Sequence, residues 1–451
     1  MGKLLAGFAR MDITPELGVP LAGYYVERIS DGVRDPLEVS ASAVSDGEKT
    51  AVVVGADLLQ LDFSYCLEIR KLVAERKGVD ADCVFIACSH THTGPVVSKN
   101  EGERFKSDRL YDEFLMRRIA DTACLAIDDM RPAKVYSGTA VAQRIAFVRR
   151  FRMKSGKVQT NPGVWNPEIE APIGDVDETV RIVRFTREDA DDIAIVNFGV
   201  HPDVIGGCEV SADYPGFMRR TLEKALDGVK CVFLNGAEGD VNHVNVNPVG
   251  GDVNGLEMKS FDAVARGYEH SRHMGRRIAG AVIGAWDKLT EQEETGVGFG
   301  GKTIEIASNR EGQVTLERAE EIIRLHESGR DAELEFKKME LTTAVAEAYR
   351  IRRLAKGPDH FDLHLSAVRV GNVALLGIPG EPFTDIGRRV IAGSPFGSTA
   401  VCSLANGCEG YFPTYDAYAE GGYEARSSIF ASDVADRIVD GAIGLLEELK
   451  G

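Results

Sequence analysis

The feature that most constrains this chain is an apolar run that ends in two closely spaced histidines. Residues 84–88 (Val-Phe-Ile-Ala-Cys) have the composition of a short buried strand, and Gly94-Pro95 terminates the segment. If extended geometry continues past the strand, His90 and His92 lie on one face, about 6.5–7 Å apart at the backbone. That spacing suits two rings on one metal ion, or one ring on the metal and the other on a substrate. In open α/β sheets, ligands bind outside the carboxyl ends of strands, and this pair lies at such an end.

Four later apolar runs also end in polar loops bounded by glycine or proline, at residues 193–198, 230–234, 373–378 and 400–404. These loops carry His201, Asp240, Glu381 and Tyr411. Two neutral imidazoles and a carboxylate, with one open position, have the composition of a catalytic zinc site. Magnesium and calcium favour more carboxylates and carbonyls, so the residue types indicate zinc. The alternative for each residue is an ordinary loop position without a metal.

Strand and helix signals alternate along the rest of the chain. Helices are expected at 64–77, 110–130, 214–227, 268–287 and 432–449. The pattern predicts one α/β domain spanning 1–451, with mixed β-sheets flanked by helices and a catalytic site at the C-terminal ends of strands. Residues 245–260 are rich in glycine and asparagine and indicate a mobile loop.

The segment 315–356 differs in composition from the rest of the chain. It is charged, poor in glycine and rich in alanine, glutamate and arginine. It predicts a helical hairpin inserted in the domain, with a break at Gly329. We interpret this hairpin as scaffold or as a contact in a homo-oligomer, and not as part of the chemistry.

Charge and composition exclude several classes of partner. The 451 residues carry a net charge of −17 without a basic stripe, which disfavours nucleic acid and stable membrane association. No window approaches about 20 uninterrupted apolar residues, and the first ten residues do not resemble a secretory signal. The eight cysteines are scattered, which favours free thiols in a reducing compartment. We therefore expect a cytoplasmic protein that acts on a small molecule.

Arginines are dense between residues 144 and 152, which is unusual in an acidic chain. Arg149, Arg150 and Arg152 either pair with local carboxylates or face an anion, such as a developing oxyanion. The sequence leaves both readings open.

An ordered set of motifs resembles the neutral/alkaline (non-lysosomal) ceramidases. Residues 89–95, Ser-His-Thr-His-Thr-Gly-Pro, are similar to that family's Thr-His-Thr-His-Ser-Gly-Pro. Residues 9–15 are similar to its N-terminal strand, 239–241 to its Gly-Asp-Val element and 379–383 to its Pro-Gly-Glu-Phe element. Residues 406–414 have the spacing of its Asn-x-Tyr-x-x-Tyr-x-Thr-Thr loop, and Tyr423-Glu424 falls at its Tyr-Glu. The resemblance spans most of the chain.

The resemblance implies zinc held by His90, His201, Glu381 and Tyr411. His92 would contact or protonate the reacting group beside the metal. Asp240 of the Gly-Asp-Val element, Tyr423 of the Tyr-Glu element, and Arg149, near the family's Asn-Arg-Ser element, are the other catalytic positions implied.

The chain also departs from the family pattern. Asn242 replaces the serine that follows Gly-Asp-Val, and an amide is no nucleophile. Cys408 replaces the first tyrosine of the tyrosine loop. The chain ends soon after that loop, so we expect no C-terminal immunoglobulin-like domain. We therefore expect a substrate other than ceramide.

The sequence predicts a zinc-dependent hydrolase that cleaves the amide (N-acyl) bond of a small polar substrate with a metal-activated water. His92 would protonate the leaving nitrogen, and Glu381 or a nearby carboxylate would accept a proton. One alternative is an esterase or deacylase at the same site. Another is a barrel amidohydrolase, which needs His-x-His on its first strand and eight regular βα units. A third is a non-catalytic scaffold, for which Asn242 is the best argument.

Overall fold

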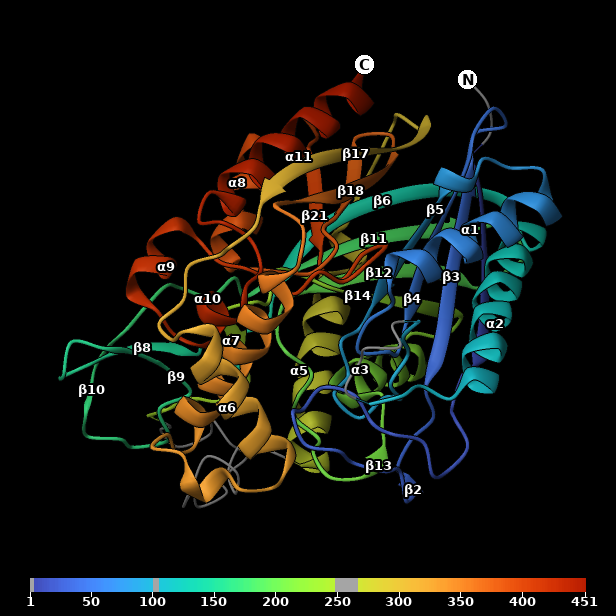
Figure 1. The fold of residues 1–451 in the computed structure, drawn as a ribbon. Coiled ribbons are helices and arrows are strands. Elements are labelled where there is room, and N and C mark those ends of the chain that lie inside the picture. The colour runs from blue at the N-terminus through green and yellow to red at the C-terminus, as the bar shows by residue number, and fades with distance from the viewer. Residues whose placement is uncertain (1–3, 100–104, 248–266) are drawn as a thin grey trace.

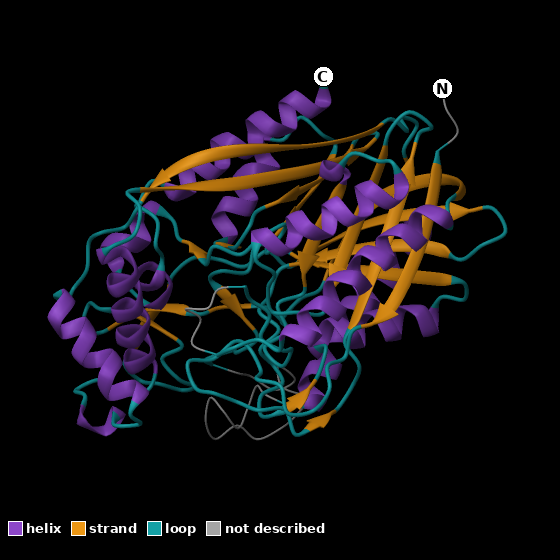
Figure 2. Cartoon of the chain, turned by 45° about the vertical axis from the view of Figure 1, so that its right-hand side comes forward, coloured by secondary structure: helices purple, strands orange, loops and turns teal. Residues whose placement is uncertain are grey.

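Two large β-sheets pack face to face in the computed structural model, which describes residues 4–99, 105–247 and 267–451 (Figures 1 and 2). The larger sheet has the order β14-β12-β11-β6-β1-β3-β4-β5, with β16 paired to β6. Its strands are β1 (Leu5–Asp12), β3 (Glu38–Ser45), β4 (Thr50–Ala56), β5 (Val84–Cys88), β6 (Arg131–Val141), β11 (Thr179–Arg187), β12 (Asp192–Phe198), β14 (Val229–Asn235) and β16 (Thr290–Glu291). The smaller sheet has the order β17 (Val297–Ala307), β18 (His360–Val370), β19 (Val373–Gly377) and β21 (Ser398–Cys402).

Helices cover the outer faces of both sheets (Figure 1). On the larger sheet, α1 (Phe63–Lys77) and α2 (Arg109–Asp128) cover one half, and α3 (Asp213–Ala225) and α5 (Tyr268–Ala285) cover the other. On the smaller sheet lie α8 (Thr384–Gly393) and α11 (Val434–Lys450). The layers are therefore helix, sheet, sheet, helix, which confirms the predicted mixed sheets flanked by helices.

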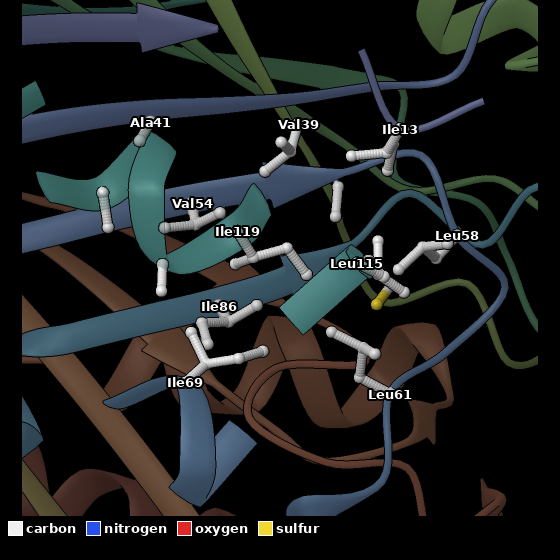
Figure 3. Packing of buried hydrophobic residues seen from close by; sticks show 14 of the residues in the cluster. Ile13, Val39, Ala41, Val54, Leu58, Leu61, Ile69, Ile86, Leu115 and Ile119 are labelled. Atoms are coloured by element: carbon white, nitrogen blue, oxygen red, sulfur yellow. The ribbon is translucent and has the colours of Figure 1, made fainter. Parts of the chain in front are cut away.

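The packing of α1 and α2 shows how the sequence builds one layer. Ile69 of α1 and Leu115 and Ile119 of α2 meet Val54 and Ile86 of the sheet, and all five side chains are almost inaccessible (Figure 3). Burial of each such side chain stabilises the fold by about 1.5–3 kcal/mol relative to exposure. The N-terminus of α2 is fixed by the Asp108 carboxylate, which accepts hydrogen bonds from the backbone of the helix's first turn.

Three β-α-β units set the position of the functional loops. The pairs β4/β5, β12/β14 and β19/β21 are parallel, and α1, α3 and α8 form their crossovers. The other neighbours in both large sheets are antiparallel. Parallel strands bring their carboxyl ends to one edge, so the loops that follow these units can meet there.

Short strands complete the loops at that edge. They pair as β2 (Gly32–Val33) with β13 (Glu209–Val210), β7 (Phe147–Val148) with β15 (Val241–Asn242), and β20 (Glu381–Pro382) with β22 (Tyr411–Phe412). A small sheet of three strands contains β8 (Arg150–Met153), β9 (Val158–Thr160) and β10 (Ile169–Pro172). Helices α9 (Tyr415–Glu420) and α10 (Tyr423–Ser427) follow β22.

The helical hairpin is inserted between two paired strands. Helices α6 (Leu316–Glu327) and α7 (Met339–Ala355) separate β17 from its antiparallel partner β18. They pack around a small apolar cluster of their own, which agrees with the two helices expected within 315–356. Gly329 has a φ of 68° just after α6, at the expected break.

Other expectations from the sequence are also met. The expected helices coincide with α1, α2, α3, α5 and α11 to within a few residues. The sheet topology excludes the barrel amidohydrolase, which needs a closed ring of parallel strands. All eight cysteines are unpaired, and six of them are buried. Of the loop expected at 245–260, residues 248–260 lie outside the described residues.

Within the described ranges, no helix has the length and apolar character needed to span a bilayer.

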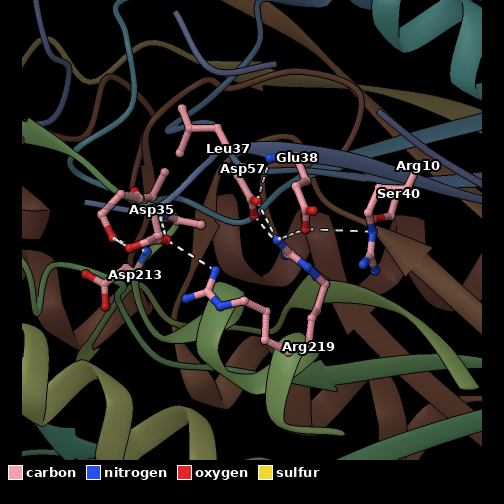
Figure 4. A network of polar contacts seen from close by, with 12 residues as sticks. Arg10, Asp35, Leu37, Glu38, Ser40, Asp57, Asp213 and Arg219 are labelled. Atoms are coloured by element: carbon pink, nitrogen blue, oxygen red, sulfur yellow. Dashed lines mark hydrogen bonds and ion pairs between the residues drawn. The ribbon is translucent and has the colours of Figure 1, made fainter. Parts of the chain in front are cut away.

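A buried ion pair joins α3 to the end of β4 (Figure 4). Arg219 Nη1 donates to Asp57 Oδ1 at 2.9 Å, and its Nη2 donates to Asp57 Oδ2. The two side chains are 4% and 1% exposed. The next residues, Leu58 and Leu59, supply carbonyls that bind His90, so this pair also anchors the histidine loop.

We predict that Arg219→Leu lowers the free energy of unfolding by about 3–5 kcal/mol, because it leaves the buried Asp57 carboxylate without its partner. Urea denaturation measures this loss. The double variant Arg219→Leu with Asp57→Asn removes the unpaired charge and should recover part of the stability. A loss below about 1 kcal/mol, the size expected for a surface pair, would contradict the prediction.

Candidate metal centre

The backbone at His90 departs from the extended geometry assumed from the sequence. Strand β5 ends at Cys88, and His90 has a φ of 73°, in the left-handed region that non-glycine residues seldom adopt. This turn lets its N–H donate to Leu58 O at 2.9 Å and its ring Nδ1–H donate to Leu59 O at 3.0 Å. Because Nδ1 carries that proton, the Nε2 lone pair faces the centre of the site.

The loop after β12 fixes His201 in the same way. Its Nδ1 lies 2.9 Å from Glu238 O and 3.0 Å from Val241 O, so it carries the proton that these carbonyls accept. Its Nε2 lone pair then points inward, where Arg149 Nη1 lies 3.2 Å away. Burial, followed by the charge of Arg149, lowers the pKa of His201 to about 4, which keeps the ring neutral.

Glu381 and Tyr411 reach the same point from adjacent short strands. They are direct partners in the parallel β20/β22 pair. Glu381 Oε2 lies 3.4 Å from His90 Nε2 and 3.0 Å from His201 Nε2, and the Tyr411 hydroxyl lies 3.4 Å from His201 Nε2. Gly380 permits this approach, since a Cβ on it would lie 2.4 Å from the Gly410 carbonyl oxygen.

These four side chains fit a divalent cation. With both rings in the tautomers fixed above, the Nε2 lone pairs and the Glu381 carboxylate face one another with no proton between them. Among the described residues, His90 Nε2 and Glu381 Oε2 are buried and lack a hydrogen-bond partner. Imidazole and carboxylate groups are common zinc ligands, and a cation at this point would satisfy them together with the Tyr411 oxygen.

His92 lies beside this cluster and lines the cavity above it. Its ring centroid is 4.9 Å from that of His90 and nearly perpendicular to it. Within the described part of the chain, neither ring nitrogen has a hydrogen-bond partner. Gly23 lies directly against the His92 ring. A Cβ at this position would come within 2.5 Å of Nδ1, so there is no room for a side chain. His90, His92 and His201 also offer nitrogen atoms within 4.8 Å of one another, so His92 is placed either to bind the cation or to meet a substrate.

Arg149 contacts two of the expected metal ligands, His201 and Tyr411. Its Nη1 approaches His201, and its guanidinium lies 5.3 Å from the centroid of the Tyr411 ring. Nε donates to Glu424 Oε1 at 2.6 Å and Nη2 donates to Gly239 O at 2.7 Å. These contacts place Arg149 where it can orient His201 and Tyr411, and the catalytic role expected for it stays a prediction.

The neighbouring arginines are paired with carboxylates. Arg150 and Arg152 both bind Glu420, at 3.1 and 3.2 Å. The structure therefore favours local ion pairing over an anion partner for these two residues.

Tyr423, at the start of α10, lines the cavity with its ring centroid 5.5 Å from that of Tyr411. Its hydroxyl lies 3.5 Å from the hydroxyl of Tyr25. It is thus close to the cluster on the side from which a substrate would approach.

Asp240 does not line the cavity. Its Oδ1 accepts hydrogen bonds from Thr384 N and Oγ1, both at 2.8 Å, at the N-terminus of α8. The Asn242 side chain is also engaged elsewhere, because its Nδ2 donates to Asn161 Oδ1 and its Oδ1 accepts from Val244 N. These contacts support the loops around the cluster, and the catalytic role expected for Asp240 stays a prediction.

One residue that the sequence did not single out is Glu238. It follows β14 by three residues and is wholly buried, and its carboxylate lies close to His90 and Glu381. Burial raises its pKa to about 8. The sequence pattern that identified the other site residues, a polar residue just past an apolar strand, also applies to Glu238.

A cavity of about 1620 Å³ opens above the cluster. The hairpin forms one wall of this cavity, and its interpretation as scaffold or oligomer contact stays a prediction. Its lining residues are His326, Glu327, Gly329, Asp331, Tyr349, Arg352 and Arg353. The hairpin is held to the site by Glu347, which binds Arg426 of α10, and by His326, which contacts Tyr25 O at 3.3 Å.

Fold and site together define a mixed α/β protein with a His/Glu metal-binding group at the ends of its strands. No protein-family model and no curated protein matches the sequence. Among solved structures, the chain is similar to a neutral ceramidase from Pseudomonas aeruginosa, with a TM-score of 0.73 and 18% identity over 100% of this chain and 75% of that one. It is also similar to a ceramidase complexed with C2, with a TM-score of 0.71 and 17% identity over 100% and 76% of the two chains. The chain therefore has the fold of the neutral ceramidases, which confirms the fold that the resemblance implied.

Proposed function

We propose that this protein is a zinc-dependent hydrolase that cleaves the amide (N-acyl) bond of a small polar substrate. The observation that carries the proposal is the convergence of two imidazoles, a carboxylate and a phenol at the floor of a cavity. The ceramidases that share its fold support amide hydrolysis as the class of reaction.

His90, His201, Glu381 and Tyr411 would hold the zinc. When bound, zinc supplies a Lewis acid for the substrate carbonyl and lowers the pKa of a bound water to about 7. The chain's own contribution is orientation, because backbone carbonyls fix both imidazole tautomers and Arg149 supports His201 and Tyr411.

His92 is the residue placed to move a proton. Burial and the neighbouring rings hold its pKa well below the usual range, so the ring is neutral before reaction. A neutral ring beside the carbonyl can accept a proton from the attacking water and deliver it to the leaving nitrogen. The leaving nitrogen then departs as a neutral amine.

The cavity lining favours a polar substrate over a lipid with two long alkyl chains. Charged side chains line it beyond the metal cluster, among them Glu27, Asp62, Lys99, Glu327 and Arg352. Alkyl chains laid against these groups would remove water from them without replacing its hydrogen bonds, which is unfavourable. The unpaired cysteines support a reducing compartment such as the cytoplasm, where we place the protein.

The test is hydrolysis of a substrate panel by one preparation, before chelation, after chelation and after zinc is restored. The panel contains short N-acyl sugars and amino acids, their O-acyl counterparts, and ceramide in detergent. We expect turnover of N-acyl compounds that is lost on chelation and restored by zinc. Faster turnover of the O-acyl set would make the protein an esterase, and faster turnover of ceramide would overturn the polar substrate. Zinc binding without turnover of any compound would leave a non-catalytic protein.

A further inference from the structure

Glu238 is a buried carboxylate that the proposed chemistry does not use. Its side chain is 0% exposed, and within the described residues its carboxylate oxygens have no hydrogen-bond partner apart from a weak contact with the Ser403 hydroxyl. An ionised carboxylate in such a position is strongly destabilising unless a cation or a set of donors satisfies it. Within the described residues no arginine or lysine pairs with this carboxylate, and a bound metal ion is a partner that would satisfy it.

The carboxylate faces the metal cluster. Glu238, His90 and Glu381 each offer a ligand atom, and these three atoms all lie within 4.8 Å of one another. Two of the other atoms at this point, His90 Nε2 and Glu381 Oε2, are also buried without hydrogen-bond partners. Two carboxylates this close repel each other when ionised, unless a positive charge lies between them.

The backbone around Glu238 holds the side chain in place. Its carbonyl accepts hydrogen bonds from His201 Nδ1 at 2.9 Å and from Val241 N at 2.9 Å. The next residue, Gly239, donates to Pro382 O at 2.9 Å, and a Cβ on it would lie 2.4 Å from Glu381 O. The segment is thus packed against the strand that carries Glu381. Glu238 itself supports His201 through its backbone carbonyl and faces His90 with its side chain.

We propose that Glu238 is a further ligand of the divalent cation bound at this centre. The inference rests on the proposed function only in that it needs a metal at the His90/His201/Glu381 cluster. The ligand set then holds two imidazoles, two carboxylates and a phenol. Additional carboxylate oxygen suits harder cations, so Glu238 makes this centre more tolerant of Mn²⁺ relative to Zn²⁺.

The test compares the whole protein with Glu238→Leu, which fills the buried space without a donor, and Glu238→Gln, which keeps the shape. Zinc and manganese affinities are measured by competition with a chelator, and the zinc coordination shell is measured by X-ray absorption. Glu347→Gln, at a buried glutamate of the hairpin that pairs with Arg426, is the control for loss of a buried carboxylate. Circular dichroism checks the fold of every variant.

We expect Glu238→Leu to lose one oxygen from the zinc shell and more than roughly 100-fold in zinc affinity, beyond the 10–100-fold typical of an outer-shell partner. Manganese affinity should fall further than zinc affinity, and Glu347→Gln should leave both unchanged. An unchanged zinc shell in Glu238→Leu would overturn the inference even if affinity falls, since it would make Glu238 a neighbour and not a ligand. If the wild type binds metal and both Glu238 variants bind it with unchanged affinity, the inference is wrong while the proposed function stands. Absence of metal from the wild type would overturn it together with the proposed function.

Discussion

Replacing His90 or His201 by alanine should prevent the proposed zinc binding and abolish the proposed hydrolysis while the fold persists. Both rings present Nε2 to Glu381 Oε2, at 3.4 and 3.0 Å, and each is held in that tautomer by backbone carbonyls. We expect about one zinc per wild-type chain, as in catalytic zinc sites of this composition. Elemental analysis of the purified protein after dialysis measures the stoichiometry.

The control is His360→Ala, which removes an exposed histidine at the start of β18. It should bind as much zinc as the wild type. Circular dichroism and the urea midpoint show whether each variant stays folded, since both site histidines lie at strand ends and outside the apolar clusters. Full metal retention in both His90→Ala and His201→Ala would disprove the ligand assignment.

The sequence predicted the elements whose residues combine apolar side chains with a clear end. Strands β5, β12, β14 and β19 are buried throughout or nearly so, and each reads as an apolar run followed by glycine or proline. The same rule located His90, His201, Glu381 and Tyr411, because parallel strands place such loops at one edge of a sheet.

Strands β6 and β17 were not identified, for a physical reason. Strand β6 begins Arg131-Pro132 and is half-exposed along much of its length, so its residues lack a continuous apolar signal. Strand β17 contains Gly298, Gly300 and Gly301, and glycine has low strand propensity. Their strand structure depends on the partners β11 and β18, which a local pattern does not reveal.

The parts of the site that escaped sequence analysis depend on contacts between distant segments. The left-handed turn at His90 is set by the carbonyls of Leu58 and Leu59, some 30 residues earlier in the chain. The hairpin joins the cavity wall through Glu347 and Arg426, which are 79 residues apart. Such pairings follow from the tertiary fold, and no single stretch of sequence contains them.

Substitution of His92 tests whether metal binding and proton transfer are carried out by different residues of the site. If His92 meets the substrate, His92→Ala should keep its zinc and lose roughly 10²–10⁴-fold in kcat, the usual contribution of a positioned acid or base. The structure supports this division, because both ring nitrogens lack hydrogen-bond partners within the described residues and the ring lines the cavity, whereas His90, His201, Glu381 and Tyr411 already meet one another. The measurement pairs zinc content with steady-state kinetics on the best N-acyl substrate of the panel.

Gly23→Ala is the matched variant, since its methyl group would push on Nδ1 of His92 and should reduce kcat without removing the metal. Loss of zinc from His92→Ala would instead make His90, His92 and His201 a three-histidine site, as their spacing also permits.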